Sequence, residues 1–135
     1  MMTTTLKPAH GMRPPLTGST MPELVCGQVV WVNLNPVVGS EQAGHRPAVV
    51  VSSDEYLAAI PNVVIVLPIT TRDRGLPNHV RLRGSTGLDE ACFAMTEQPR
   101  TIDRRRITDT AGEVDRGSLR ELRLCLARFL GIDHD

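Results

Sequence analysis

The stretch that decides the fold is Gly-Ser-Glu-Gln-Ala-Gly-His-Arg-Pro at residues 39–47, which runs into Ala-Val-Val-Val-Ser at residues 48–52. Its first half is polar and carries two glycines, as expected of a loop. Pro47 withholds a backbone donor and biases the residue before it toward an extended backbone, so a strand can begin here. The apolar run that follows is continuous rather than alternating, which predicts a strand covered on both faces.

Short apolar runs bounded by turn residues lie on both sides of this stretch, a pattern typical of a small barrel or sandwich. The predicted strands cover residues 25–34, 48–51, 63–70, 78–82, 91–102 and 110–114. Pro99 places part of the fifth strand at an edge or a bulge. The pattern therefore predicts a mainly β protein.

Two helices are expected beside these strands. Residues 52–54, Ser-Ser-Asp, can cap a short helix over residues 55–60. Ser118 and Glu121 have the spacing of a capping box, and the apolar residues after them recur at helical spacing. Gly131 is placed to end this second helix. The fold class is therefore α+β, with a single helix closing the chain.

The chain is expected to form one domain at residues 23–135, preceded by a disordered tail over residues 1–22 that is rich in Thr, Pro and Gly. Met21 raises the hypothesis that the native protein starts there. Aromatic residues make up 3% of the chain, so the core must be aliphatic. The three cysteines are far apart and lack zinc-site spacing, as expected of reduced thiols in a cytoplasmic protein. No apolar run approaches the roughly 20 residues of a membrane span.

The charges balance to a formal net charge of zero, which by itself argues against non-specific binding of nucleic acid. The type of basic residue is informative, because Lys7 is the single lysine among 15 basic residues. Arginine suits bidentate recognition of phosphates and base edges. The alternative is that a GC-rich coding sequence raises the arginine content at any surface position.

The candidate chemistry needs neither a metal nor a cofactor, since the sequence has no metal-ligand cluster, Gly-rich phosphate loop or nucleophile elbow. Glu41, His45, Arg46 and Thr70 are the groups expected to converge, because neighbouring strands carry Arg46 and Thr70. A guanidinium and a hydroxyl can stabilise negative charge on a phosphoryl group. A carboxylate or imidazole can move protons. RNA supplies its own nucleophile, the 2′-hydroxyl.

At these residues the sequence resembles the MazF/PemK (Kid) family of toxin endoribonucleases. The similarity covers roughly residues 25–132. The motifs that carry it are Trp-Val-Asn-Leu-Asn-Pro at 31–36, Gly-Ser-Glu-Gln-Ala-Gly-His-Arg-Pro-Ala-Val-Val at 39–50, Pro-Ile-Thr-Thr at 68–71, and Glu97-Gln98 followed by Arg100 and Ile102. Many relatives have Asp where this chain has Asn33 and Asn35. Because amides are neither acids nor bases, these two positions are expected to contact bases or hold the turn.

The resemblance implies an SH3-like small β-barrel of the MazF/PemK/CcdB type with a C-terminal helix, which acts as a homodimer. It also implies sequence-specific, metal-independent cleavage of single-stranded RNA that leaves a 2′,3′-cyclic phosphate and a 5′-hydroxyl. A cognate MazE-like antitoxin would block the site. The implied catalytic residues are Arg46, Thr70 and Glu41. The implied RNA-binding residues are Asn33, Asn35, Gln42, His45, Thr71, Arg83, Gln98 and Arg100.

Two other functions remain open at this point. The first is a CcdB-like gyrase poison, but that family depends on a C-terminal Trp-Gly-Ile, whereas this chain has Leu130-Gly131-Ile132 and its one tryptophan is Trp31. The second is a barrel that binds single-stranded RNA without cutting it.

Each candidate residue also has a structural alternative. Arg46 could form a structural salt bridge, and the hydroxyl of Thr70 could close its strand on a neighbouring carbonyl. Arg83 could be a solvated edge charge rather than a backbone contact. The run of three arginines at 104–106 is interpreted as a solvated turn.

Overall fold

The strands form one antiparallel sheet whose central member is the most hydrophobic segment of the chain. The computed structural model describes residues 23–34 and 44–132. The elements in chain order are β1 (Gln28–Asn33), β2 (His45–Val50), α1 (Asp54–Ala59), β3 (Val63–Thr70), β4 (His79–Leu82), β5 (Cys92–Met95), β6 (Arg100–Asp103), the 3-10 helix η1 (Arg104–Arg106), β7 (Ile107–Glu113) and α2 (Arg116–Leu130). The predicted tail and the possible start at Met21 lie outside the described residues.

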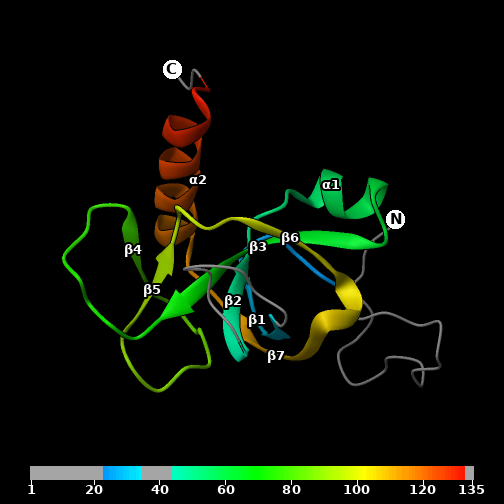
Figure 1. Cartoon of the computed structure of the whole chain (residues 1–135), viewed down its shortest axis with the longest axis horizontal. Helices are drawn as coiled ribbons and strands as arrows, with labels where there is room; N and C mark the ends of the chain where they lie inside the picture. The colour runs from blue at the N-terminus through cyan, green and yellow to red at the C-terminus, as the bar shows by residue number, and fades with distance from the viewer. Residues whose placement is uncertain (1–22, 35–43, 133–135) are drawn as a thin grey trace.

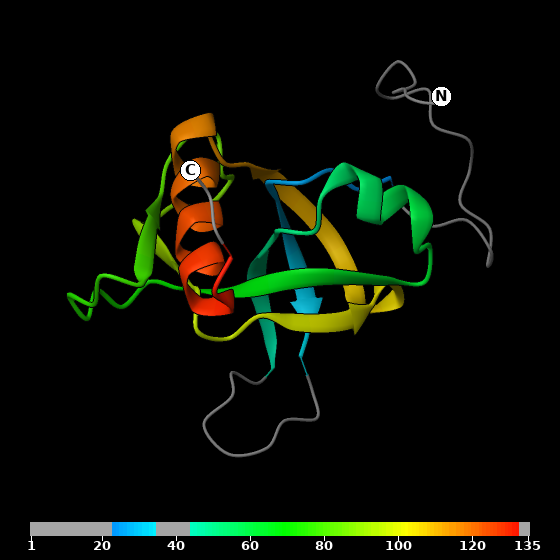
Figure 2. The same ribbon diagram turned by 90° about the horizontal axis from the view of Figure 1, so that it is seen from above.

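The sheet follows the order β4-β5-β3-β2-β1-β7, and β6 pairs with β3 beside this path. Figures 1 and 2 show α2 at the end of the molecule that holds β4, and α1 at the opposite end. The mainly β class with a C-terminal helix is confirmed. Closure into a barrel is not, because no pairing joins β4 to β7 within the described part of the chain.

The predicted strand over residues 91–102 is two strands. Ile69 of β3 pairs with Ala94 of β5, whereas Val66 pairs with Arg100 of β6. Two residues of β3 therefore face five residues, 95–99. Of these, Met95 ends β5, and residues 96–99 leave the sheet as a turn. Pro99 predicted an edge or a bulge here, but the strand was expected to be continuous. A local sequence pattern does not show where a partner strand stops pairing.

The core lies on both faces of β2, as the unbroken apolar run predicts. Ala48 and Val50 belong to one buried cluster with β3 and β6 residues, and Val49 belongs to a second cluster with Leu122 and Cys125 of α2. Ala48, Val49 and Val50 are all 0% exposed. Because successive strand residues point to opposite faces, this burial fixes the register of β2. Arg46 lies two residues before Ala48 and therefore points to the same face as Ala48.

The two helices begin at different kinds of cap. Ser53 caps α1 by accepting from the Tyr56 backbone N–H, as predicted. The predicted capping box at Ser118 is wrong: Asp115 is the N-cap, and its carboxylate accepts from the Ser118 N–H. The Ser118 hydroxyl instead accepts from the Arg83 N–H at 2.9 Å, which ties the end of β4 to α2. At the other end of α2, Gly131 is the C-cap with φ 70°, as predicted.

The arginine run at 104–106 is not a simple solvated turn. Arg104 is 8% exposed, and its guanidinium donates to the carbonyls of Leu57, Ile60 and Val63 at 2.6, 2.9 and 3.0 Å. Leu57 and Ile60 lie at the C-terminal end of α1, where carbonyl groups have no partner within the helix. Arg104 thus joins α1 and β3, while Arg105 remains exposed beside Asp103.

Candidate active site

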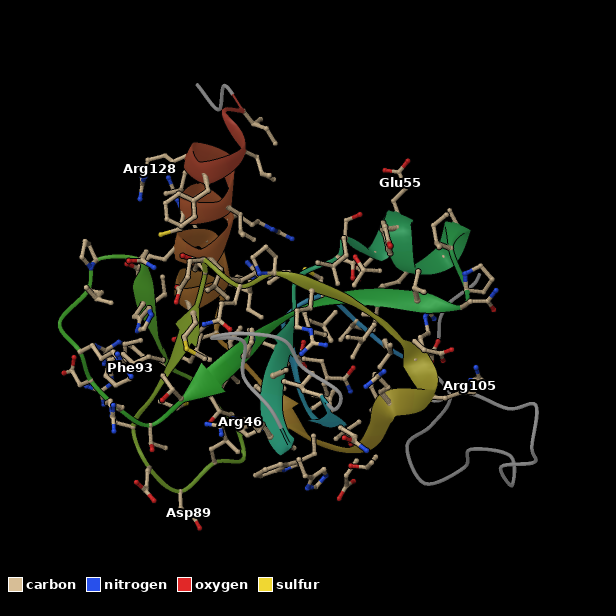
Figure 3. The ribbon with its side chains drawn as sticks, in the orientation of Figure 1. Arg46, Glu55, Asp89, Phe93, Arg105 and Arg128 are labelled. Atoms are coloured by element: carbon tan, nitrogen blue, oxygen red, sulfur yellow. The ribbon has the colours of Figure 1, made fainter. Side chains whose placement is uncertain are left out.

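A groove of about 870 Å³ opens where the ends of β2 and β3 meet the turn between β5 and β6. The lining residues come from four separate parts of the chain: Arg46, Thr70, Thr71, Arg72, Arg74, Leu76, His79, Met95, Glu97, Gln98, Pro99 and Arg100. Figure 3 shows Arg46 between the ends of β2 and β3. The groove therefore collects the Thr-Thr and Glu-Gln motifs around the arginine of the long motif.

Strand register accounts for the juxtaposition of Arg46 and Thr70. Ala48 pairs with Pro68 across β2 and β3. Continuing this antiparallel register by two residues places Arg46 opposite Thr70 on the same face of the sheet. Side chains at such positions are direct neighbours, with Cβ atoms about 5 Å apart. Both residues line the groove, so neither is sealed in the core.

Both groups have hydrogen-bonding capacity for a ligand. The Nε of Arg46 is buried and has no hydrogen-bond partner among the described residues, and no ion pair holds its guanidinium within that part of the chain. The Thr70 hydroxyl accepts from the Arg72 backbone N–H at 3.1 Å, which leaves its own proton available for donation. The salt-bridge alternative for Arg46 and the carbonyl-bonded alternative for Thr70 therefore find no support among these residues.

The groove is strongly basic although the chain as a whole is neutral. Arg46, Arg72, Arg74 and Arg100 line it, against Glu97 as the one carboxylate among the described lining residues. Arg100 also donates to the Leu34 carbonyl at 3.3 Å, which directs its guanidinium across the sheet toward β1. Focused positive charge of this kind attracts a polyanion even where the net charge is zero.

Glu97 is held by a network at one wall of the groove. Its Oε1 accepts from Asn78 Nδ2 at 2.7 Å, and its Oε2 accepts from His79 Nε2 at 3.1 Å and from Gln98 Nε2 at 3.4 Å. Burial alone would raise the pKa of Glu97, but hydrogen bonds from its own backbone amide, His79 and Gln98, together with the His79 charge, lower the pKa below its usual value. The carboxylate is therefore ionised at neutral pH.

Three predicted RNA-binding residues do not line the groove. His45 follows the strand alternation to the face opposite Arg46, where its ring stacks on Trp31 at 5.3 Å and its Nε2 lies 2.7 Å from Thr108 Oγ1. Asn33 is exposed and pairs with His45 across β1 and β2. Arg83 follows β4 at the end away from the groove, beside the N-terminus of α2. The predicted residues Asn35, Glu41 and Gln42 lie outside the described residues.

The sequence analysis missed four polar members of the groove. Arg72, Arg74 and His79 were given no role, and Glu97 was noted only as part of a motif. The local sequence offers one signal, since both arginines lie within three residues of the Thr-Thr motif. His79 and Glu97 meet only through the pairing of His79 with Met95 across β4 and β5.

The described residues contain no cluster of three His, Cys, Asp or Glu side chains that could hold a metal ion. In the part of the chain that the structure covers, no helix is long and apolar enough to span a membrane.

Comparison with known proteins gives the family. The model of the PemK-like, MazF-like toxins of type II toxin–antitoxin systems matches residues 26–130, which include both strands of the Arg46–Thr70 pair. The chain belongs to this family. The resemblance found in the motifs is thereby confirmed, and the PemK/MazF assignment is favoured over a CcdB-like gyrase poison.

Individual relatives of this PemK/MazF-family protein support the same family assignment. Endoribonuclease EndoA of Bacillus subtilis is 34% identical over 91 residues, which cover 66% of this chain and 78% of that protein. Endoribonuclease toxin MazF of Escherichia coli K12 is 38% identical over 76 residues, covering 56% of this chain and 65% of the relative. The crystal structure of MazF from Deinococcus radiodurans superposes with a TM-score of 0.70 at 30% identity, over 84% of this chain and all of that one.

Proposed function

We propose that this PemK/MazF-family protein is the toxin of a type II toxin–antitoxin pair and acts as a metal-independent endoribonuclease on single-stranded RNA. The observation that carries the proposal is the guanidinium of Arg46, with a buried unpartnered Nε among the described residues, next to the hydroxyl of Thr70 in a basic groove. The names of EndoA and MazF as endoribonucleases support the same activity.

The proposed reaction uses the nucleophile that RNA carries. The 2′-oxygen attacks the adjacent phosphorus, the bond from phosphorus to the 5′-oxygen breaks, and the products are a 2′,3′-cyclic phosphate and a 5′-hydroxyl. Arg46 stabilises the extra negative charge of the phosphorane, because a guanidinium keeps its proton and cannot act as a base. Thr70 donates a hydrogen bond to a phosphoryl oxygen. Glu41 is the proposed base for the 2′-hydroxyl proton, and the leaving 5′-oxygen takes up a proton from water to become the 5′-hydroxyl.

The remaining groove residues are proposed to bind the strand. Arg72, Arg74 and Arg100 supply positive charge along the phosphates, the role that a divalent cation fills in many nucleases. Thr71 and Gln98 carry polar groups that can contact bases. Asn33, Asn35, Gln42, His45 and Arg83 remain predicted contacts, to which segments beyond the groove or a second subunit would contribute.

The test is cleavage of a long RNA of known sequence in the presence of EDTA. The parent should give discrete fragments, and Arg46→Ala or Thr70→Ala should lower the rate by about 10²- to 10³-fold, as the loss of one transition-state donor does. Arg120→Ala, an exposed arginine on α2, is the matched control and should cut at the parental rate. An intact but shifted RNA band would instead identify a binder, and parental rates for either active-site variant would refute the roles assigned here.

The partners proposed are a MazE-like antitoxin and a second copy of the chain. Structures of the Deinococcus radiodurans MazF include a MazE–MazF complex, with a TM-score of 0.66 at 30% identity to this chain. By analogy, an antitoxin would cover the groove. Phe129, Leu130 and Ile132 are 57%, 69% and 55% exposed at the end of α2, and such apolar exposure supports a protein contact there. The cytoplasm is the proposed location.

A further inference from the structure

The groove contains an acidic group whose presence is not explained by the binding of a polyanion. Glu97 stands among four arginines, and its side chain is 39% exposed. A carboxylate repels phosphates, so it weakens RNA binding unless it faces something other than the backbone. The groups of RNA that carry N–H donors are the bases.

The carboxylate is fixed in position from behind. Asn78 holds Oε1 and His79 holds Oε2, and the His79 side chain is only 4% exposed, so a ligand reaches Glu97 rather than the imidazole. His79 Nδ1 is buried without a partner among the described residues, which is unfavourable for stability. This geometry indicates that the His79 side chain serves to hold Glu97 in place, so His79 is a positioning residue. A carboxylate oxygen has the capacity for more than one hydrogen bond, and the Gln98 contact to Oε2 at 3.4 Å is long enough to be replaced.

We propose that Glu97 is a specificity-determining residue that reads guanine through the N1–H and N2–H groups of its Watson–Crick edge. The inference deepens the proposed function, on which it rests, by naming a base that the groove selects. An ionised carboxylate offers only acceptors, and guanine alone places two donors side by side on that edge. Adenine and cytosine put a ring-nitrogen acceptor beside their amino group, and uracil places its single N–H between two carbonyls.

The surroundings fit an unpaired base. Leu76 and Met95 line the same groove and offer apolar contact to a ring face, while Arg46, Arg72 and Arg74 line it with positive charge that suits the flanking phosphates. Single-stranded RNA exposes its Watson–Crick edges for such contacts. The Glu97 pKa, which its hydrogen bonds lower, keeps the acceptor pair ionised throughout the neutral range.

The experiment maps cut sites on a long RNA and then replaces single atoms of the base. The parent should show guanosine at one fixed position relative to the cut. In a short substrate, inosine at that position removes the N2 amino group and should lower kcat/KM about tenfold, as loss of one hydrogen bond to a charged acceptor does. Glu97→Gln should cut the guanosine substrate more slowly and treat the guanosine and inosine substrates alike within about twofold, since the amide no longer presents two acceptors.

Glu121→Gln makes the same charge change on the exposed surface of α2 and should keep the parental discrimination. Where Glu97→Gln cuts too slowly to measure, competition binding of the two oligonucleotides gives the same comparison. Cleavage with no fixed guanosine, or undiminished inosine discrimination by Glu97→Gln, overturns the inference and leaves the nuclease proposal standing. A parent that cuts no RNA overturns the proposed function and, with it, this reading of Glu97.

Discussion

Replacing Arg104 by alanine tests how this sheet is held to its first helix. The guanidinium donates hydrogen bonds to the backbone carbonyls of Leu57, Ile60 and Val63, at 2.6, 2.9 and 3.0 Å. Each hydrogen bond to a charged group contributes about 1.5–3 kcal/mol, and an unpaired buried carbonyl costs about 1–3 kcal/mol. Only the bond to Leu57 is fully buried, and a cavity of about 340 Å³ lined by Arg104 lets water replace part of the others.

Counting the buried bond in full and the other two in part gives a loss of about 3 kcal/mol for Arg104→Ala. That is a large share of the roughly 5–15 kcal/mol that stabilises a domain of this kind. The urea midpoint should fall by roughly 1.5–2 M at an m-value of about 1.5–2 kcal/mol/M, and the Tm by about 10 °C. Both are measured by far-UV circular dichroism on the purified chain.

Matched controls separate the hydrogen bonds from the loss of charge. Arg104→Lys keeps the charge but cannot reach three carbonyls at once, so its midpoint should lie between those of the parent and Arg104→Ala. Arg105→Ala removes a neighbouring arginine whose side chain is 80% exposed and should leave the midpoint unchanged. An Arg104→Ala protein that unfolds at the parental urea concentration, or an equal loss in Arg105→Ala, would show that the hydrogen bonds of Arg104 do not stabilise the fold.

Two further predictions concern backbone and pH. Gly75 and Gly87 both have positive φ, but a Cβ on Gly75 meets open space whereas one on Gly87 meets the Ala111 backbone carbonyl. Gly75→Ala should cost about 1–2 kcal/mol from conformation alone, and Gly87→Ala clearly more in the same urea titration; equal costs would contradict the placement of Gly87 against β7. The folded-state pKa of Glu97 is lowered, so its contribution to stability is present above the unfolded pKa of about 4.3 and is lost as pH falls through the folded pKa. Parent stability should therefore fall more steeply than that of Glu97→Gln below about pH 4.5, and parallel curves would show that the hydrogen-bond network around this carboxylate does not stabilise the fold.

The parts of the fold that follow from local chemistry were predictable. The β3 strand has the predicted bounds, because its apolar run is bracketed by turn residues. The continuous run in β2 correctly indicated burial on both faces. The start of α2 was placed too late because Asp115 and Ser118 both have capping side chains, and only the tertiary contact of Ser118 with Arg83 shows which one caps.

The Arg46–Thr70 pair at the centre of the site could be predicted from the sequence, but the Glu97 network at its wall could not. Arg46 and Thr70 belong to motifs on neighbouring strands, and their juxtaposition follows from antiparallel register. The contact between His79 and Glu97 depends instead on how β4 and β5 pair and on the turn that breaks the strand after β5. No spacing in the sequence encodes that contact, since each residue is unremarkable within its own segment.

The proposed function requires that this groove cleaves RNA with the nucleophile that the substrate provides. The most direct measurement is cleavage of a short RNA whose cut site has been mapped, with a single 2′-deoxynucleotide on the 5′ side of the scissile phosphate. We predict that this substrate binds as tightly as the parent RNA and is not cut. Cleavage at the parental rate would show that the 2′-oxygen does not attack, and would contradict the roles given to Arg46 and Thr70.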